Sequence, residues 1–347
     1  MNQLRTTLLT LALAGLSVTS AWAAPAGTDP EQARQAFSQY NRLHTVIAAH
    51  QGEIFFEETW GGPGPFEPVN IKSVSKTILS ALVGKAIEEG VIESVDQPVV
   101  DLLSNRVPAN ADPQVDDITV GNLLSMQAGL QRTSGNNYAR WVISDNWVSY
   151  VLSREFVADP GDERLYSTGS SHLLSAALTD ASGQTTWQLA QQWLSEPLNV
   201  RIPQWLRDPQ GIYFGGNDML MSPRALLRFG EMYRQGGSIG GRQVLDPHWV
   251  DLSWQPRGTS RWSGDLYGYG WFITELGGHR AYYGRGYGGQ VLWVIPELEL
   301  TIVVTSSPNP PSPGGRYVRE LAQIVEDFLL PDPATPQASA SGQQDEG

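Results

Sequence analysis

The sequence predicts an α/β (α+β) fold in which both ends of the chain build one antiparallel sheet, terminal helices flank it, and a mostly helical region is inserted between. Three observations predict this fold. First, strand patterns occur near both ends of the chain. Second, one helical pattern precedes the N-terminal strands and another follows the C-terminal strands. Third, the middle of the chain consists of helical patterns and long loops. Because each element must bury its apolar face, the helices should cover the sheet. A cleft between sheet and helical region is the expected site.

The N-terminal part predicts a helix followed by two strands. Residues 29–43, DPEQARQAFSQYNRL, begin with Asp29 as a helix N-cap and Pro30 at the first helical position. Residues 45–60, TVIAAHQGEIFFEETW, alternate as two strands around a Gln51-Gly52 turn. This half of the sheet therefore precedes the helical region.

The C-terminal part mirrors this arrangement. Strand patterns run through YGYGWFITEL (267–276), HRAYYGRGYGGQ (279–290) and QVLWVIPELELTIVVTS (290–306). The last segment, GRYVRELAQIVEDFLL (315–330), places apolar residues at helical spacing, at Tyr317, Leu321, Ile324 and Phe328. It predicts the second helix that covers the sheet.

The first 23 residues are typical of a cleaved signal peptide. Arg5 precedes an apolar run, Leu8 to Val18, and Ala21-Trp22-Ala23 forms a cleavage site. The run is short for a membrane span, so the mature chain is expected in the periplasm or secreted, without membrane insertion. The remaining residues predict one domain at 24–330 and a disordered tail at 331–347. Within the domain we expect an α/β lobe at about 29–70 and 260–330, and the helical region at about 71–259.

Composition excludes several classes of function. A net charge of −13 does not favour nucleic acid as a partner. The absence of cysteine excludes disulfides and thiolate chemistry. The five histidines lack metal-binding spacing, so neither a metal nor a cofactor is predicted. A small-molecule substrate is the expected partner, and the oligomeric state stays open.

All three lysines of the chain lie within IKSVSKTILSALVGKAIEEG, residues 71–90. All other basic side chains, apart from histidine, are arginines. A lysine in such a chain can have a chemical role, because a buried lysine can lose its proton. Lys72 and Lys85 are expected at solvated positions. Ser73 and Lys76 form an S-x-x-K motif at the start of an apolar helix that Gly90 ends, and the spacing puts both on one face. A serine beside a desolvated lysine is an activated nucleophile.

Two further stretches complete a candidate site. Tyr166 follows Pro160-Gly161 and precedes an apolar helix, and a tyrosine near the Ser–Lys pair can relay a proton. The strand YYGRGYGGQVLWVIP is dense in glycine, so its backbone can approach a ligand closely and give an N–H to an oxyanion hole. Each stretch alone has an ordinary structural explanation, a capped loop or a hairpin.

Two other motifs are rejected. GGSIG, at 236–240, fits G-x-S-x-G, but a helical pattern precedes it and no apolar helix follows, so Ser238 is not expected to be a nucleophile. GRGYGG, at 284–289, fits a dinucleotide motif, but a strand follows it where a helix N-terminus would be needed.

Taken in order, these stretches resemble the serine β-lactamase and penicillin-binding-protein superfamily, and most closely the class C β-lactamase-related branch with its esterases and 6-aminohexanoate-dimer hydrolases. The resemblance runs from about residue 40 to 330 and includes ITVGNLLSMQAGL, PGDERLYSTG, EPLNV, MSPRALLRFGEMYRQGG and YGYGWF. It implies a β-lactamase/transpeptidase-like fold. It also implies catalytic residues Ser73, Lys76 and Tyr166, an oxyanion hole of the Ser73 and Tyr287 backbone, and substrate-binding residues Arg285, Gly286, Gly288, Tyr138 and Thr168.

The sequence departs from the family at two motifs. Thr168 stands where the Tyr-x-Asn element has Asn, and Gly284-Arg285-Gly286 stands where a Lys-Thr-Gly motif is usual, leaving Arg285 or Arg280 to replace the lysine. These departures favour an exported hydrolase of a carboxylic ester or amide over an efficient β-lactamase. The alternatives are a D-alanyl-D-alanine carboxypeptidase or weak β-lactamase, and a non-catalytic penicillin-binding sensor. Tyr138, Trp141 and Trp147 either wall an apolar substrate pocket or pack in the core.

Overall fold

The central feature is a twisted antiparallel sheet whose strands come from both ends of the chain. The computed structural model describes residues 24–103, 105–311 and 314–332, and within these ranges the sheet has eight strands in the order β2-β1-β12-β11-β10-β9-β8-β7. The N-terminal strand β1 pairs with β12, the last strand, so the two halves of the sheet join in its interior. The fold class expected from the sequence is confirmed.

The strands of the main sheet are β1 (Leu43–His50), β2 (Glu53–Thr59), β7 (Gly258–Thr259), β8 (Leu266–Tyr267), β9 (Phe272–Leu276), β10 (His279–Gly286), β11 (Gln290–Ile295) and β12 (Leu300–Ser306). Two small two-stranded sheets pair β3 (Val69–Asn70) with β4 (Leu220–Met221) and β5 (Ser238–Ile239) with β6 (Arg242–Gln243). The hairpin expected around Gln51-Gly52 is present between β1 and β2.

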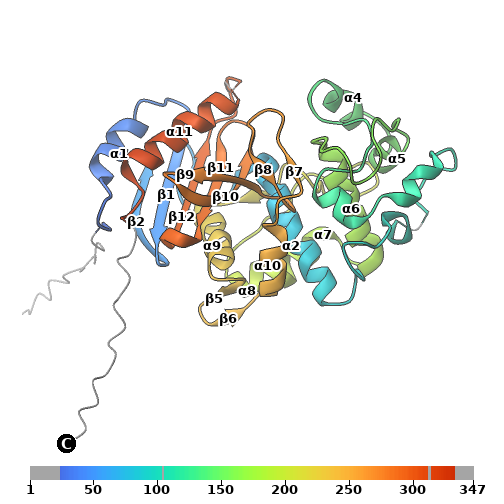
Figure 1. Ribbon diagram of the computed structural model, residues 1–347, viewed down its shortest axis with the longest axis horizontal. Helices are drawn as coiled ribbons and strands as arrows, with labels where there is room; N and C mark the ends of the chain where they lie inside the picture. The colour runs from blue at the N-terminus through green and yellow to red at the C-terminus, as the bar shows by residue number, and fades with distance from the viewer. Residues whose placement is uncertain (1–23, 104, 312–313, 333–347) are drawn as a thin grey trace, which may run out of the picture.

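Two terminal helices cover one face of the sheet, as Figure 1 shows at its left. They are α1 (Pro30–Phe37) and α11 (Gly315–Phe328), which contact each other. Their apolar stripes are buried against the sheet; α11 contributes Tyr317, Leu321, Ile324 and Val325. The helix expected over 29–43 is shorter, because the chain turns after Phe37 before β1 begins.

The opposite face of the sheet is covered by α9 (Pro223–Arg234), which contacts β12, β11 and β1. This helix falls inside the stretch 71–259 expected to form the helical region, yet it packs on the sheet. Its buried Leu226, Phe229 and Met232 recur at helical spacing and account for this position. The expected boundary at residue 259 therefore does not separate the residues that pack on the sheet from those of the helical region.

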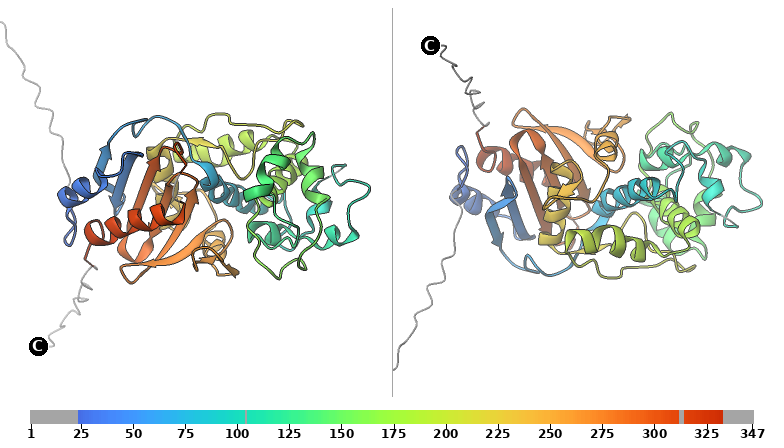
Figure 2. Two further views of the ribbon diagram at one scale, coloured as in Figure 1. Left: turned by 90° about the horizontal axis from the view of Figure 1, so that it is seen from above. Right: turned by 90° about the horizontal axis from the view of Figure 1, so that it is seen from below.

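Most of the remaining helices form a second lobe, seen at the right of Figure 1 and in both views of Figure 2. The buried helix α2 (Ser75–Glu88) runs from the sheet into this lobe, where it contacts α6 (Thr168–Ser182). The other α-helices are α3 (Val120–Leu124), α4 (Tyr138–Val142), α5 (Trp147–Leu152), α7 (Thr186–Ala190), α8 (Glu196–Leu198) and α10 (Pro247–Ser253). Shorter turns are η1 (Lys72–Val74), η2 (Val99–Leu102), η3 (Pro113–Asp117), η4 (Gly135–Asn137), η5 (Gln191–Ser195) and η6 (Pro296–Leu298).

Two sequence predictions lie wholly or mostly outside the described residues. The signal peptide at 1–23 is one, and the tail at 331–347 is the other, except for its first two residues. Among the residues described, no helix combines the length and apolarity required to cross a bilayer.

Candidate active site

Ser73 lies in the short 3-10 turn η1, immediately before α2 begins at Ser75. The turn is held from both sides. Lys72 has a positive φ of 51° and its Nζ lies 3.0 Å from Asp218 Oδ1, while its backbone N–H donates to Asn70 Oδ1 at 2.9 Å. Lys72 is therefore a half-buried anchor of the turn, which corrects the expectation of a solvated lysine. Lys85 is half-buried too and pairs with Glu88 and Glu89 at the end of α2, so the expectation of a solvated position is wrong for both lysines.

Lys76, one turn into α2, is buried with only 3% of its surface exposed. Its Nζ donates to Ser73 Oγ at 3.1 Å, to the carbonyl oxygen of Gly216 at 2.6 Å and to Thr168 Oγ1 at 3.3 Å. Among the described residues it forms no ion pair with a carboxylate. Burial lowers the pKa of Lys76 and outweighs the opposing effects of Tyr166 and Asp218. The amine is thus placed and tuned to accept a proton from Ser73.

Tyr166 contacts the same pair from the loop before α6. The Lys76 Nζ lies 4.9 Å from the centre of its ring. Burial alone would raise the pKa of Tyr166, but the charge of Lys76, contacts with the Ser73 and Lys76 side chains, and the charge of Arg285 together lower it. The pKa values of Lys76 and Tyr166 are therefore both below their ordinary values, and the charge of each group affects the other.

The strand β10 passes very close to the turn that carries Ser73. A Cβ placed on Gly286 would lie 2.5 Å from the backbone oxygen of Ile71, and one on Gly284 would lie 2.6 Å from Thr77 Oγ1. Glycine at these two positions lets the strand approach the start of α2 without a side chain between them. This is the physical reason for the glycine-dense strand seen in the sequence.

A cavity of about 220 Å³ opens between β10 and the Tyr166 loop. Six of the site residues expected from the sequence line this cavity: Ser73, Tyr166, Arg285, Gly286, Tyr287 and Gly288. Tyr287 follows the last residue of β10 and lines the same cavity as Ser73. The arrangement offers a nucleophile, a proton relay and backbone donors to a carbonyl compound.

Besides the buried Lys76, three other candidates do not line this cavity. Thr168 is turned toward Lys76 and toward Ser134 Oγ, at 2.9 Å. Tyr138 accepts a hydrogen bond from Asn217 Nδ2 at 2.8 Å and stacks on Phe214, beside a different hollow. Arg280 lines a hollow on the far part of β10. Of the two arginines considered as substitutes for the missing lysine, Arg285 is the one in the cavity.

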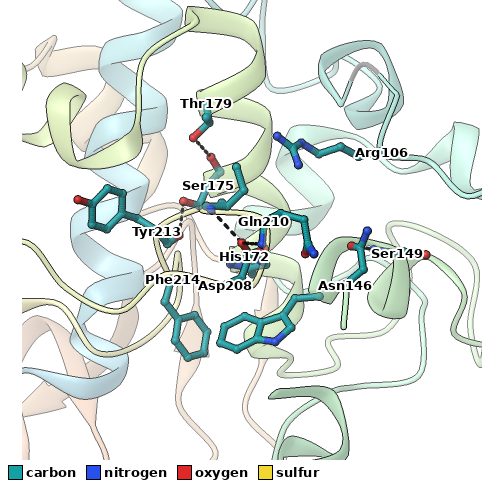
Figure 3. A network of polar contacts seen from close by, with 12 residues as sticks. Arg106, Asn146, Ser149, His172, Ser175, Thr179, Asp208, Gln210, Tyr213 and Phe214 are labelled. Carbon is teal, nitrogen blue, oxygen red and sulfur yellow. Dashed lines mark hydrogen bonds and ion pairs between the residues drawn. The ribbon is translucent and has the colours of Figure 1, made fainter. Parts of the chain in front are cut away.

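Figure 3 shows the polar network that joins α6, through His172 and Ser175, to the loop that carries Asp208 and Tyr213. His172 Nε2 lies 3.0 Å from Asp208 Oδ2, and both side chains are fully buried. Asp208 Oδ1 also accepts from the backbone N–H of Gln210 and of Ile212, and Ser175 donates to the carbonyl of Tyr213 at 2.6 Å. His172 therefore does not face the cleft. Trp141 and Trp147 pack around it and are buried in the core, and Trp147 also lines the hollow beside Tyr138 rather than the cavity beside Ser73.

Sequence reasoning missed several residues of the site. Gly216 supplies the shortest contact to Lys76, and Gly215-Gly216 pack so closely on α6 that a Cβ on Gly216 would lie 2.9 Å from Ser171. The Gly-Gly pair in FGGND was the available signal. Arg164 and Trp262 also line the cavity. Ser238, from the rejected GGSIG motif, lies in the β5–β6 hairpin and donates to Gln243.

Comparison with protein families decides the classification. The family model described as Beta-lactamase matches residues 33–326, most of the chain. The chain belongs to the beta-lactamase family. This family consists of serine hydrolases and includes esterase-like, amidase-like and carboxypeptidase-like enzymes.

This chain is 25% identical over 229 residues to a curated relative, the D-alanyl-D-alanine-carboxypeptidase/endopeptidase AmpH of Escherichia coli (strain K12). That match covers 59% of this chain and 58% of the relative, so the chain spans less than two thirds of that relative's length. It is 26% identical to the 6-aminohexanoate-dimer hydrolase of Paenarthrobacter ureafaciens, over 74% of this chain and 71% of the relative.

Solved structures share the fold at lower identity. EstCE1, a hydrolase with promiscuous acyltransferase activity, superposes with a TM-score of 0.71 at 20% identity, covering 85% of this chain and 96% of that chain. A penicillin-binding protein homologue from Caulobacter crescentus gives a TM-score of 0.68 at 17% identity, covering 88% and 99%.

Proposed function

We propose that this protein is an exported serine hydrolase that cleaves a carboxylic ester or amide through an acyl-enzyme on Ser73. The observation that carries the proposal is the contact of 3.1 Å between Lys76 Nζ and Ser73 Oγ, made by a buried amine whose pKa is lowered. A lysine in that state is a base and not a surface charge. The family membership supports a hydrolase in general, and the residue roles are inferred from this geometry.

In the proposed cycle, Ser73 Oγ attacks the substrate carbonyl carbon and its proton passes to the Lys76–Tyr166 pair. The backbone N–H groups of Ser73 and Tyr287 receive the developing oxyanion. The pair returns the proton to the leaving alcohol or amine as the tetrahedral intermediate collapses to the acyl-enzyme. A water molecule then attacks the acyl carbon and gives a proton to the pair, which passes it to Ser73 Oγ as the bond between Ser73 and the acyl carbon breaks and the acid is released.

A second candidate is peptidase activity on D-alanyl-D-alanine peptides, near the activity named for the AmpH relative. One observation favours it. Arg285 lies in the cavity and, among the described residues, forms no ion pair with a carboxylate, so it is free to bind a terminal carboxylate. A weak β-lactamase would use the same group. A non-catalytic sensor would be acylated without turnover.

The experiment compares purified wild type, Ser73→Ala and Ser238→Ala on p-nitrophenyl acetate, p-nitrophenyl butyrate, nitrocefin and a D-alanyl-D-alanine dipeptide substrate. We expect ester turnover that Ser73→Ala reduces by about 1000-fold or more. Ser238→Ala is the matched control, a serine outside the cavity, and should keep wild-type rates. Full turnover by Ser73→Ala would refute the proposal.

The same assay separates the alternatives. Dominant cleavage of the D-alanyl-D-alanine substrate would establish the peptidase, and rapid nitrocefin cleavage the β-lactamase. Stoichiometric acylation by a penicillin in intact-mass spectra, with no turnover of any substrate, would establish the sensor. Export is tested separately, by sequencing the mature N-terminus after expression in a Gram-negative host, where cleavage after Ala23 is expected.

A further inference from the structure

Residues 216–221 form a strap that runs beside the turn carrying Ser73. Its last two residues, strand β4, pair with β3, which ends just before the turn. The Ile71 N–H donates to the Met219 carbonyl oxygen at 3.0 Å, and the Met219 N–H donates to Ser75 Oγ at 3.2 Å. The strap therefore holds the chain on both sides of Ser73.

An ion pair between Lys72 and Asp218 adds a side-chain contact between the turn and the strap. Lys72 Nζ lies 3.0 Å from Asp218 Oδ1, and Asn70 Nδ2 donates to the same oxygen at 2.6 Å. Both partners have a positive φ, 51° for Lys72 and 63° for Asp218, which is uncommon outside glycine. Strained residues of this kind gather at functional sites, and a half-buried ion pair by itself contributes little to stability. A role beyond stability is therefore the better explanation for this pair.

The pair lies next to the base of the proposed reaction. The charged and titratable groups that face Lys76 or its neighbour Tyr166 come from the strap, the loop before α6 and β10, and include Asp218, Tyr166, Arg164 and Arg285. On α6, Thr168 contributes a neutral hydroxyl 3.3 Å from Lys76 Nζ. Burial lowers the pKa of Lys76, while Tyr166 and then Asp218 raise it. The Asp218 carboxylate thus favours the protonated amine, and Lys72 is the cation paired with that carboxylate.

We propose that Lys72 and Asp218 are a positioning pair, whose contact clamps the turn carrying Ser73 and balances a carboxylate that would otherwise hold a proton on Lys76. The inference rests on the proposed function, because it concerns how the base of that reaction is tuned. Opposite charges 3.0 Å apart act on a third group much more weakly than a lone charge does. Neither residue lines the cavity beside Ser73, so both act through Ser73 and Lys76 and not on the substrate.

Lysine NMR tests the electrostatic part of the proposal without any turnover. The chain has only three lysines, so protein labelled with ¹³C at lysine Cε gives three signals. Lys72→Met and Lys85→Met each remove one signal, which assigns the third to Lys76. Titration of that signal across the alkaline range reports the pKa of Lys76 directly.

Lys72→Met should raise the pKa of Lys76 and Asp218→Asn should lower it, each by about 0.5 pH unit or more, because the first removes a cation and the second an anion. The double variant should titrate between the two single variants, since both charges are gone. Lys72→Arg, which keeps the charge, should stay at the wild-type value. Lys85→Met, at the other end of α2, is the matched control and should leave the titration of Lys76 unchanged.

The pH profile of kcat/KM for p-nitrophenyl acetate carries the same test into the reaction. Its acid limb should move to higher pH in Lys72→Met and to lower pH in Asp218→Asn, and Lys72→Arg should keep the wild-type limb. At neutral pH, Lys72→Met should lose about 10-fold or more in kcat/KM, because the turn also loses its clamp. A purely structural role would reduce stability without moving the limb in opposite directions.

The outcomes separate this inference from the proposed function. If Ser73→Ala keeps full ester turnover, the proposed function fails, and the NMR titration still decides whether the pair acts on Lys76. If Ser73 is required but the Lys76 signal and the acid limb stay in place in both charge variants, the positioning pair is refuted and the proposed function stands. Should Lys72→Met fail to fold, Asp218→Asn and Lys72→Arg carry the test, with a lowered and an unchanged pKa of Lys76 expected.

Discussion

At the scale of single residues, the proposed mechanism depends on the protonation state of the Lys76–Tyr166 pair. Lys76 is lowered in pKa by burial, and Tyr166 is lowered by the charge of Lys76 despite its own burial. Because each group shifts the other, the two titrate as a pair with shared apparent pKa values. Deprotonation of this pair makes it a base toward Ser73, and protonation removes that base.

We therefore expect kcat/KM for p-nitrophenyl acetate, a neutral ester, to rise with pH through an apparent pKa below the ordinary lysine value of 10.5. Tyr166 raises the pKa of Lys76, so Tyr166→Phe should move this acid limb to lower pH while reducing kcat by about 100-fold or more. The measurement is a pH profile of both proteins. A wild-type rate independent of pH, or an acid limb that moves upward in Tyr166→Phe, would contradict the assignment.

At the scale of elements, the site is a junction between the η1 turn, the start of α2 and strand β10. The strand contributes almost no side chains at the contact, because Gly284 and Gly286 face the turn and helix directly. Tyr287 follows the strand end and lines the same cavity as Ser73. In the proposed mechanism the oxyanion donors are backbone N–H groups, so the packing of the strand on the turn sets their spacing.

Gly286→Ala tests this junction. Its Cβ would meet the backbone oxygen of Ile71 at 2.5 Å, so strand and turn must separate. We expect kcat/KM to fall by about 10- to 100-fold, because small misplacements of donors are costly, while far-UV circular dichroism stays that of a folded protein. Gly64→Ala is the matched control, since there a Cβ would meet only the end of Glu67 at 3.7 Å. Wild-type kinetics in Gly286→Ala would show that the junction tolerates separation.

At the scale of the whole molecule, the sequence predicted the sheet, its covering helices and the pairing of Ser73 with Lys76, because strand alternation and helical spacing are local signals. It could not predict that Lys72 would anchor to Asp218 or that Gly216 would accept from Lys76, since these contacts join distant segments. Tyr138 was expected at the substrate, but its hydroxyl is bonded to Asn217. No local pattern in the sequence marks Arg164, which is buried only by the fold.

The arrangement of the apolar cores over the whole molecule determines how the protein unfolds. One continuous apolar core includes Ile47 and Leu292 of the sheet, Leu82 of α2 and Leu173 of α6 in the helical lobe. A second core lies on the other face of the sheet, under α1 and α11. Because the first core crosses from one lobe to the other, neither lobe can lose its packing without exposing apolar surface of the other.

We therefore expect a single unfolding transition in urea, with tryptophan fluorescence and far-UV circular dichroism coincident, since Trp141 reports on the helical lobe and Trp271 lies beside Phe229 at the sheet side. Phe229→Ala, in α9 on the sheet and within the core that both lobes share, should destabilise the fold by about 3–5 kcal/mol and shift both signals together. The exposed Phe66→Ala is the control and should change stability little. Two separated transitions, or a Phe229→Ala effect confined to one probe, would show that the lobes unfold independently.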